Sequence, residues 1–386
     1  MSTSHWHLVT GEFPPALGGV SDYSLQIAAG LAAAGERVHV WCPDAGGDRP
    51  DARSIEVHRI AGAWRGSDLT RIDLALDRTP AGRRLLVQWV PHAYGRRSLN
   101  IGFCRWVRRR ASRGDTIDLM VHEPFLSFGE GGWRHNGAAA VHRLMAAMLL
   151  GVTRRAWVAI PAWAPALRPW VLGRRPPFCW LPVPSNIPVR ADAAAVAALR
   201  ERLAGGHALF GHFGTYGRDT CAALTRILAQ LLPRAPESRV LLLGLGGDAF
   251  ADQLRRDLGP PASRVHATGA LDLEALSLHL QACRVLVQPY TDGASTRRGT
   301  LMAALAHGIP VATTYGRLSE PFWRDSEAVT AVPAGDDAGI VEAAVTLAVD
   351  PVRTDRQARA ARQLYEARFD VRHAIQALLS DACTTA

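Results

Sequence analysis

The stretch Pro289–Gly299 reads PYTDGASTRRG and separates two segments that differ in their apolar periodicity. The segment before it, Arg284–Gln288, is short, apolar and β-branched, which is typical of a buried strand. After it, Leu301 and Leu305 recur at helical spacing until Gly308, a residue that suits the position just past a helix end. The sequence therefore predicts a strand, a loop of small residues and a helix.

The predicted loop carries two hydroxyl and two guanidinium groups directly before the helix, on Ser295, Thr296, Arg297 and Arg298. Free backbone N–H groups at a helix N-terminus attract anions, and arginine adds bidentate binding of phosphate. The alternative is a solvated turn with an ordinary helix cap. We favour an anion site because the two halves of the chain independently show the pattern of nucleotide-binding folds.

Composition narrows the class of protein. The 386 residues, of which 48% are apolar, suggest two or three domains with well-formed cores. No lysine occurs, so the net charge of +9 comes from arginine, and any bound phosphate would meet guanidinium groups. The six cysteines include no Cys-x-x-Cys pair, which supports neither a zinc site nor a disulfide framework and fits a reducing cytoplasm.

Neither the start of the chain nor its apolar runs predict export or membrane insertion. Met1–Pro15 lacks the basic start and apolar core of a secretory signal. The longest helix-like apolar run, Leu144–Val152, is far shorter than the ~20 residues that span a bilayer. We expect a soluble, cytoplasmic protein.

The N-terminal half begins with a strand–helix–strand pattern. A strand at His7–Thr10 precedes the pair Gly18-Gly19, and Ser21 caps a helix that ends near Gly35. The next strand is Arg37–Trp41, which completes the βαβ unit of a doubly wound sheet. The spacing is not Gly-x-Gly-x-x-Gly, so these glycines predict a loop that closely approaches a ligand and not a dinucleotide fingerprint.

Three later strands of this half are predicted at Leu85–Val90, Asp118–His122 and Ala156–Ile160. Polar residues follow two of them: Gln88 and His92 flank Pro91, and His122-Glu123-Pro124 ends a strand abruptly. Ligands of open α/β sheets bind outside the carboxyl ends of the strands. A lone histidine there also serves as a structural hydrogen-bonding residue, and both interpretations of His122 stay open.

The segment Arg83–Arg113 holds nine arginines, interleaved with Trp89, Tyr94, Phe103 and Trp106. A solvated basic face is the default interpretation. A surface for anionic lipid headgroups at the inner face of a membrane is the second, since arginine and tryptophan suit an interface. Nucleic-acid binding is the least favoured, because no RNA- or DNA-binding module accompanies the charge.

The proline-rich segment Arg174–Arg190 marks a domain boundary. We expect an acceptor-binding domain at 1–185, a nucleotide-sugar-binding domain at 186–365 and a final helix at 366–386 that packs back on the first domain. Strands of the second domain are predicted at Ala208–His212, Arg239–Leu243, Val265–Gly269 and Pro310–Thr314, besides Arg284–Gln288. The expected fold is α/β, with two Rossmann-like doubly wound domains that face each other across a cleft.

Five motifs in order carry a resemblance that covers the chain from about residue 7 to about residue 375. They are Gly11–Ser21, His122-Glu123-Pro124, Phe213-Gly214, Thr268-Gly269 and Ala303–Val311. In this order they resemble the retaining glycosyltransferases of family 4, which have the GT-B fold. The resemblance implies that Gly18-Gly19 approaches the donor diphosphate and that His122, with Glu123 beside it, acts on the transferred sugar. It also implies a nucleotide base near Gly269, Ala270 and Leu271.

The chain departs from the family pattern at the donor site. The positions of the usual two glutamates hold Ser295 and Ala303, and Thr215 stands where the family has an arginine. We hypothesise that Arg218, Arg297 and Arg298 replace the missing phosphate clamp, assisted by Ser295 and Thr296. The predicted diphosphate-binding residues are thus Gly18, Gly19, Arg218, Ser295, Thr296, Arg297 and Arg298. Gln88, His92 and Tyr94 are the predicted acceptor-binding residues.

The resemblance implies transfer of a sugar from a nucleoside diphosphate sugar, as substrate, to an acceptor hydroxyl of a glycan, glycolipid or small molecule. No cofactor and no metal site are expected, since the chain lacks an Asp-x-Asp pair. One alternative is a sugar-nucleotide epimerase, for which Glu12, Glu123 and Glu320 are the available carboxylates. The other is a partner protein that binds a nucleotide sugar without turnover.

Overall fold

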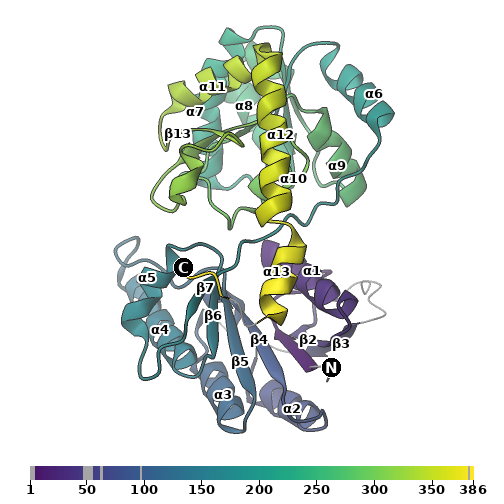
Figure 1. The fold of residues 1–386 in the computed structure, drawn as a ribbon. Coiled ribbons are helices and arrows are strands. Elements are labelled where there is room, and N and C mark those ends of the chain that lie inside the picture. The colour runs from purple at the N-terminus through teal and green to yellow at the C-terminus, as the bar shows by residue number, and fades with distance from the viewer. Residues whose placement is uncertain (1–4, 47–54, 61–63, 96–97, 381–382) are drawn as a thin grey trace. The chain divides into compact units, whose positions relative to one another are not determined.

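The computed structural model describes residues 5–46, 55–60, 64–95, 98–380 and 383–386, which form two compact α/β units (Figure 1). The first unit comprises Met1–Val183 and Val371–Ala386, and the second comprises Pro184–Asp370. The chain therefore returns to the first unit at its C-terminal end, where α13 (Val371–Leu379) packs on α1 (Gly19–Ala33).

Within the described residues, the first unit has a seven-stranded parallel sheet in the order β3-β2-β1-β4-β5-β6-β7. Its strands are β1 (His5–Val9), β2 (Arg37–Pro43), β3 (Ile55–Ile60), β4 (Arg84–Trp89), β5 (Thr116–Val121), β6 (Arg155–Val158) and β7 (Phe178–Trp180). The central strands are almost fully buried because helices cover both faces, as parallel sheets require.

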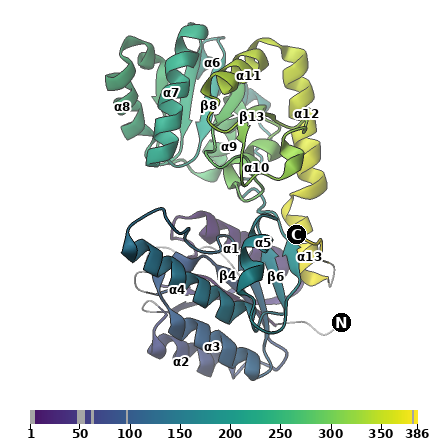
Figure 2. The same ribbon diagram turned by 90° about the vertical axis from the view of Figure 1, so that its left-hand side faces the viewer.

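Each face of this sheet has its own hydrophobic core. One face packs against α2 (Gly66–Leu76), α3 (Ile101–Ser112) and α4 (Trp133–Leu150), which lie along the same side of the unit in Figure 2. The opposite face packs against α1 and α13, through residues such as Ile27 and Ile375. The short helix α5 (Trp163–Leu167) follows β6.

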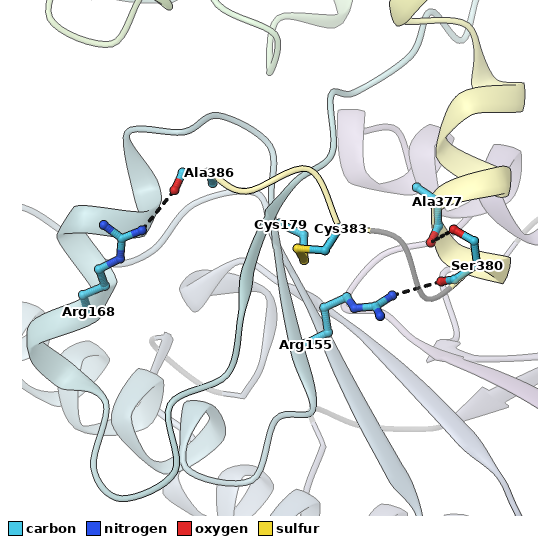
Figure 3. Close-up of a disulfide and its surroundings, with 7 residues drawn as sticks. All are labelled: Arg155, Arg168, Cys179, Ala377, Ser380, Cys383 and Ala386. Atoms are coloured by element: carbon cyan, nitrogen blue, oxygen red, sulfur yellow. Dashed lines mark hydrogen bonds between the residues drawn. A yellow bond between two sulfur atoms is a disulfide. The ribbon is translucent and has the colours of Figure 1, made fainter.

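The C-terminal residues pair with β7 in the antiparallel direction. They are also joined to it by the disulfide Cys179–Cys383, which Figure 3 shows. The backbone N–H of Trp180 donates to the carbonyl of Thr384 at 2.9 Å, and that of Ala386 donates to the carbonyl of Phe178 at 3.0 Å. The expectation that the cysteines form no disulfide is therefore wrong. Residues 204 positions apart meet because the chain returns to the first unit, and cysteine spacing alone cannot reveal that return.

The second unit contains, in the described part of the chain, a six-stranded parallel sheet in the order β10-β9-β8-β11-β12-β13. Its strands are β8 (Leu209–Phe213), β9 (Arg239–Leu243), β10 (Val265–Ala267), β11 (Val285–Gln288), β12 (Val311–Tyr315) and β13 (Thr330–Pro333). Its helices are α6 (Ala193–Ala204), α7 (Arg218–Arg234), α8 (Gly247–Leu258), α9 (Leu273–Ala282), α10 (Gly299–Ala306), α11 (Asp337–Val349) and α12 (Pro351–Arg368). The core contains buried residues of α7, α8 and α11 against one face of the sheet.

The predicted strand–loop–helix around Pro289–Gly299 is confirmed as β11, a loop and α10. Gly308 lies just past the end of α10 with a φ of 62°, the left-handed conformation that favours glycine there. The strands β3, β7 and β13 were not predicted. All three stand at an end of their sheet, and most side chains of β3 and β13 are only partly buried, so the sequences of these two lack a strong apolar run.

In the segment Arg83–Arg113, the aromatic residues Trp89, Tyr94, Phe103 and Trp106 belong to the core of the first unit. Arg83, Arg84, Arg109, Arg110 and Arg113 form ion pairs, several of them buried, with Asp73, Asp77, Asp115 or Asp118. Arg105 and Arg108 are exposed, and Arg96 and Arg97 lie outside the described residues. A surface for anionic lipid headgroups stays a prediction. None of the helices in the described segments has the length and apolar character needed to cross a membrane.

Candidate functional site

Each sheet has a point where its strand order reverses, between β1 and β4 in the first unit and between β8 and β11 in the second. Loops that leave neighbouring strands diverge at such a point and open a space outside the carboxyl ends of the strands. Most of the predicted site residues lie at the ends of these strands or of their neighbours, whereas Gly269–Leu271 follow the edge strand β10. We describe the two edges separately.

At the carboxyl edge of the first unit, His122 follows β5 and Gln88 lies near the end of β4. The two side chains are buried, and His122 Nε2 lies 2.8 Å from Gln88 Oε1. Because the amide oxygen only accepts, the proton lies on Nε2 of the imidazole. Burial lowers the pKa of His122 to about 3, so the ring is neutral at physiological pH. His122 is therefore a neutral hydrogen-bonding group and not a cation.

Spare hydrogen-bonding capacity surrounds this pair. The ring of Tyr23, on α1, meets the ring of His122 edge to face, with centroids 4.8 Å apart. The Tyr23 hydroxyl and the Gln88 Nε2 amide are buried and have no hydrogen-bond partner among the described residues. A buried polar group without a partner costs about 1–3 kcal/mol, which a polar ligand would relieve. Tyr23 was not predicted, because its helical spacing identifies it only as a core residue.

The glycine pair Gly18-Gly19 precedes α1, as predicted, but a carboxylate already occupies the helix N-terminus. Glu12 Oε1 accepts the backbone N–H groups of Val20 at 3.1 Å and Ser21 at 3.2 Å. A Cβ on Gly18 would lie 2.5 Å from that same oxygen, so glycine at this position makes room for Glu12. A Cβ on Gly19 would meet no atom within 4 Å, so only Gly19 leaves open space for a ligand.

The other predicted residues of the first unit differ in accessibility. Glu123 and His92 are exposed, His92 in the short turn Pro91–Ala93 after β4. Tyr94 is fully buried, and its hydroxyl lies 2.9 and 2.7 Å from the carbonyl oxygens of Val9 and Gln88. The prediction that Tyr94 binds an acceptor is therefore wrong, because its hydroxyl is buried in the core and hydrogen-bonds to the backbone there.

In the second unit, the loop between β11 and α10 gathers two arginines around one carboxylate. Arg297 and Arg298 each form an ion pair with Asp292, one on each carboxylate oxygen. The Arg298 guanidinium also lies 4.9 Å from the centroid of the Tyr290 ring. Two positive charges and one negative charge leave this group with a net charge of +1. The pair is thus held in position by Asp292 and retains an excess of positive charge.

The hydroxyl residues of the same loop are buried. Thr296 donates its backbone N–H and its hydroxyl to the carboxylate of Glu320, and Trp323 Nε1 donates to that carboxylate at 2.7 Å. Burial raises the pKa of Glu320, whereas these hydrogen bonds oppose the rise. The hydroxyl of Ser295 is buried and lacks a hydrogen-bond partner in the described part of the molecule. Ser295 therefore has a hydrogen-bond donor to spare, as does Arg298, whose buried Nε also lacks a partner among the described residues.

Two further residues at this edge were not predicted. His212, near the end of β8, is buried with a pKa lowered to about 3 by desolvation. Gln288, the last residue of β11, donates its Nε2 to the carbonyl of Phe213 at 2.9 Å. His212 Nδ1 and Gln288 Oε1 have no hydrogen-bond partner within the described segments. These two residues could have been predicted from the sequence, because the first unit also has a histidine and a glutamine at the ends of adjacent strands.

The remaining predicted residues of the second unit lie in two other loops that follow strands. Arg218 is exposed at the first position of α7, after the loop that leaves β8. Gly269, with a φ of 61°, Ala270 and Leu271 follow β10 and precede α9. A Cβ on Gly269 would lie 3.0 Å from a carboxylate oxygen of Asp248. The predicted phosphate and base residues are thus distributed over loops that leave the carboxyl ends of β8, β10 and β11.

The model of the family described as glycosyl transferases group 1 matches residues 208–350, which lie within the second unit. No curated protein sequence matches the chain.

Several solved structures share its fold. Sucrose-phosphate synthase from Thermosynechococcus elongatus is 18% identical, with a TM-score of 0.74 over 97% of both chains. HepE of Anabaena, in complex with UDP and glucose, is 16% identical, with a TM-score of 0.70 over 98% of both chains. WaaG, a glycosyltransferase involved in lipopolysaccharide biosynthesis, is 14% identical, with a TM-score of 0.69 over 98% of this chain and all of that one. The chain has the GT-B fold, and the expected pair of parallel-sheet α/β domains is confirmed.

Proposed function

We propose that this protein is a retaining glycosyltransferase of family 4. It would move a sugar from a nucleoside diphosphate sugar to an acceptor hydroxyl of a glycan, glycolipid or small molecule. The observation that carries the proposal is the β11–α10 loop, where two arginines and the spare hydroxyl of Ser295 lie inside the segment that matches the glycosyl transferases group 1 model.

The chemistry of this loop suits a diphosphate. Guanidinium groups bind phosphate oxygens in pairs of parallel hydrogen bonds, and a hydroxyl adds a further donor. Asp292 holds the two arginines before any ligand arrives, so less side-chain entropy is lost on binding. Arg218, at the N-terminus of α7, is the third cation that we assign to the diphosphate, and Gly269–Leu271 is assigned to the nucleotide base.

The polar groups of the first unit suit a sugar better than a phosphate. Gln88, His122 and Tyr23 are neutral, and two of their polar atoms lack partners among the residues described. Amide and hydroxyl groups of this kind bind sugar hydroxyls, and such hydrogen bonds discriminate strongly between similar substrates. We therefore assign the transferred sugar to His122 and Gln88, with exposed Glu123 beside them, and the acceptor to the neighbourhood of His92.

The proposed reaction needs no protein nucleophile. The bond between the anomeric carbon and the diphosphate oxygen breaks, and the acceptor oxygen bonds to the same face of that carbon. The acceptor proton passes to the departing phosphate. Negative charge develops on the leaving diphosphate, where Arg297 and Arg298 would stabilise it. We further propose that transfer is cytoplasmic and metal-independent, the latter since no Asp-x-Asp pair occurs in the sequence.

A second candidate function is binding of a nucleotide sugar without turnover. It is favoured by Ser295 and Ala303, which stand where the resembling family has glutamates, and by Glu12, which already occupies the amides of α1. A catalytically inactive chain would keep the arginine loop and lose the reaction. Donor binding is therefore expected under both candidates, and turnover separates them.

A two-step experiment tests the proposal. A thermal-shift screen of nucleoside diphosphates comes first, with UDP as the leading probe because the HepE structure contains it. A ligand that binds the folded state raises its apparent stability by mass action. The matching nucleotide sugars are then incubated with the protein, with and without candidate acceptors, and release of the free diphosphate is measured. Stabilisation with release supports the transferase, and stabilisation without release supports the binding protein. If neither stabilisation nor release is observed, both candidate functions are contradicted.

A further inference from the structure

A cluster of histidines lies at the opposite edge of the first unit, near the amino ends of β1, β2 and β3. His5 and His7 come from β1, His39 from β2, and His58 from β3. In the parallel pairing, His39 lies directly opposite Glu56, and His58 follows two residues later on the same face of the sheet. Neither the proposed sugar site nor the diphosphate site uses these residues.

Two of these histidines, His39 and His58, place their ligand atoms close to the carboxylate of Glu56 and to each other. His39 Nδ1 lies 3.2 Å from His58 Nε2 and 3.3 Å from a carboxylate oxygen of Glu56. His58 Nε2 lies 3.3 Å from the other oxygen of that carboxylate. In the described part of the chain, this is the one group of three or more histidine, cysteine or acidic residues whose ligand atoms lie close enough to share an ion.

These distances match the edges of a zinc coordination sphere. Ligand atoms placed tetrahedrally about Zn²⁺, at bond lengths of about 2.0–2.1 Å, lie about 3.3 Å from one another. Two imidazoles and a carboxylate form a ligand set that zinc accepts, and three protein ligands leave one position for water. The two imidazole nitrogens are thus separated by about the length of such an edge, and each lies at a similar distance from one of the two carboxylate oxygens of Glu56.

Buried rings fix the orientation of both imidazoles. The His39 ring stacks on the ring of His7, with centroids 4.7 Å apart, and the His58 ring stacks on that of Trp41, at 4.0 Å. Trp41 Nε1 in turn donates to His7 Nδ1 at 3.3 Å, and both of these supporting residues are buried. Supports of this kind orient ligands before the metal binds. Because Nδ1 of His7 accepts a hydrogen bond, His7 acts as a support and not as a ligand.

The cluster is accessible to an ion from solvent. His39 and His58 expose 12% and 25% of their side chains, and Glu56 exposes 65%. A surface hollow is lined by His5, His39 and Glu56, together with Glu36 and Arg37. An ion can therefore enter without opening the core, which is a requirement for any reversible metal site.

We propose that His39, Glu56 and His58 form a binding site for a divalent transition metal, best fitted by Zn²⁺, that ties the edge strand β3 to β2. The sequence predicts no metal site, because the patterns that indicate one, cysteine spacing and Asp-x-Asp pairs, do not detect ligands that only strand pairing brings together. The site lies at the amino ends of the strands, and the proposed sugar transfer takes place at the carboxyl ends. Zinc is therefore expected to stabilise the first unit without being needed for transfer.

The test is a titration of the untagged full-length chain, stripped of metal with a chelator, with Zn²⁺ alone. Competition against a chromophoric zinc indicator gives stoichiometry and affinity. We expect one tightly bound ion per chain, and an apparent melting temperature that rises on addition of Zn²⁺. Loss of a residue that merely supports a ligand weakens metal binding 10–100-fold, so His39→Ala and His58→Ala should each weaken it by roughly 100-fold or more.

Two further variants keep the test decisive. Glu56→Gln alters the most exposed ligand and preserves its shape, so the apo fold should be unchanged by circular dichroism while zinc affinity falls. His207→Asn changes a matched histidine in the second unit, 3.8 Å from Glu237, and should leave zinc affinity unchanged. Absence of zinc binding at stoichiometric concentrations would overturn the proposal. So would equal zinc affinity in the wild type and in a folded Glu56→Gln variant.

Discussion

The carboxyl edges of the two sheets hold the same pair of residue types in different states. In the first unit, His122 donates to Gln88 at 2.8 Å, and the Gln88 amide and the Tyr23 hydroxyl have no partner among the described residues. In the second unit, Gln288 instead donates to a backbone carbonyl, and within the described segments His212 Nδ1 and Gln288 Oε1 lack partners.

The difference lies in the neighbours. Two arginines and a serine hydroxyl without a partner among the described residues lie in the loop that follows Gln288, whereas His122, Gln88 and the neighbouring Tyr23 are uncharged. A buried histidine and glutamine at adjacent strand ends are thus combined with an arginine pair in the second unit only. This difference supports our proposal that the second unit binds the diphosphate and the first binds uncharged sugar hydroxyls.

The largest expected effect is on UDP affinity, through the two arginines at the carboxyl edge of the second sheet. Arg297→Ala with Arg298→Ala removes two charge-assisted contacts worth roughly 1.5–3 kcal/mol each, so UDP affinity should fall by at least about 100-fold. Lysine at both positions should restore it only in part, because the planar fork is lost. Calorimetric titration measures the affinities. The matched control is Arg226→Ala with Arg234→Ala, which removes two exposed ion-paired arginines of α7 and should not alter UDP binding. Equal affinity in the two double variants would break the comparison.

The disulfide distinguishes the stability of the two units. Cys179–Cys383 joins two segments of the first unit that are separated in sequence by the whole second unit, and loss of such a bond costs roughly 2–4 kcal/mol. Cys383→Ser should therefore lower the melting temperature of the first unit in the absence of reductant and have no effect in its presence. Differential scanning calorimetry under both conditions measures this. Cys221→Ser, a free cysteine of the second unit, is the control. A Cys383→Ser chain that melts like the wild type under oxidising conditions would contradict the prediction.

Much of the fold could be predicted, because it depends on local periodicity. Buried runs such as Arg239–Leu243, and Gly308 just past the end of α10, carry their own signal, and both were located correctly. The site depends instead on contacts between distant residues. Nothing in the local sequence shows that the carboxylate of Glu12 accepts hydrogen bonds from the first amides of α1, or that strand pairing places Glu56 beside His39. Residue types at strand ends therefore locate a site, and only three-dimensional packing shows which of its groups are free to bind.

Substitutions at the carboxyl edge of the first sheet should lower the turnover rate and leave UDP affinity unchanged. His122→Ala leaves Gln88 Oε1 without its donor and removes a group assigned to the sugar, at a cost of about 1–3 kcal/mol. We expect kcat for donor turnover to fall roughly tenfold to a hundredfold, with UDP affinity unchanged. His142→Ala, which removes another buried histidine of the first unit bonded to the carbonyl of Ser98, controls for a purely structural effect. A structural role for His122 predicts that the two variants lose stability and activity in parallel.

The two units share one expected pH dependence. Burial lowers the pKa of His122 and of His212 from an ordinary value of 6.5 to about 3. Below pH 6.5 the unfolded chain binds protons that the folded chain does not. The free energy of unfolding should therefore fall as the pH drops from 6.5 toward 3, by up to about 1.4 kcal/mol per pH unit for each histidine. His212→Asn should flatten this dependence in denaturant titrations between pH 7 and pH 5, whereas the exposed His92→Asn should not.

Hydrogen exchange with and without UDP tests most directly which unit holds the diphosphate. The account predicts that saturating UDP slows exchange of the amides in residues 292–300, where the arginine loop enters α10. It predicts no change in residues 18–24, because Glu12 already occupies the first amides of α1. Slower exchange confined to residues 18–24, with residues 292–300 unchanged, would contradict the account.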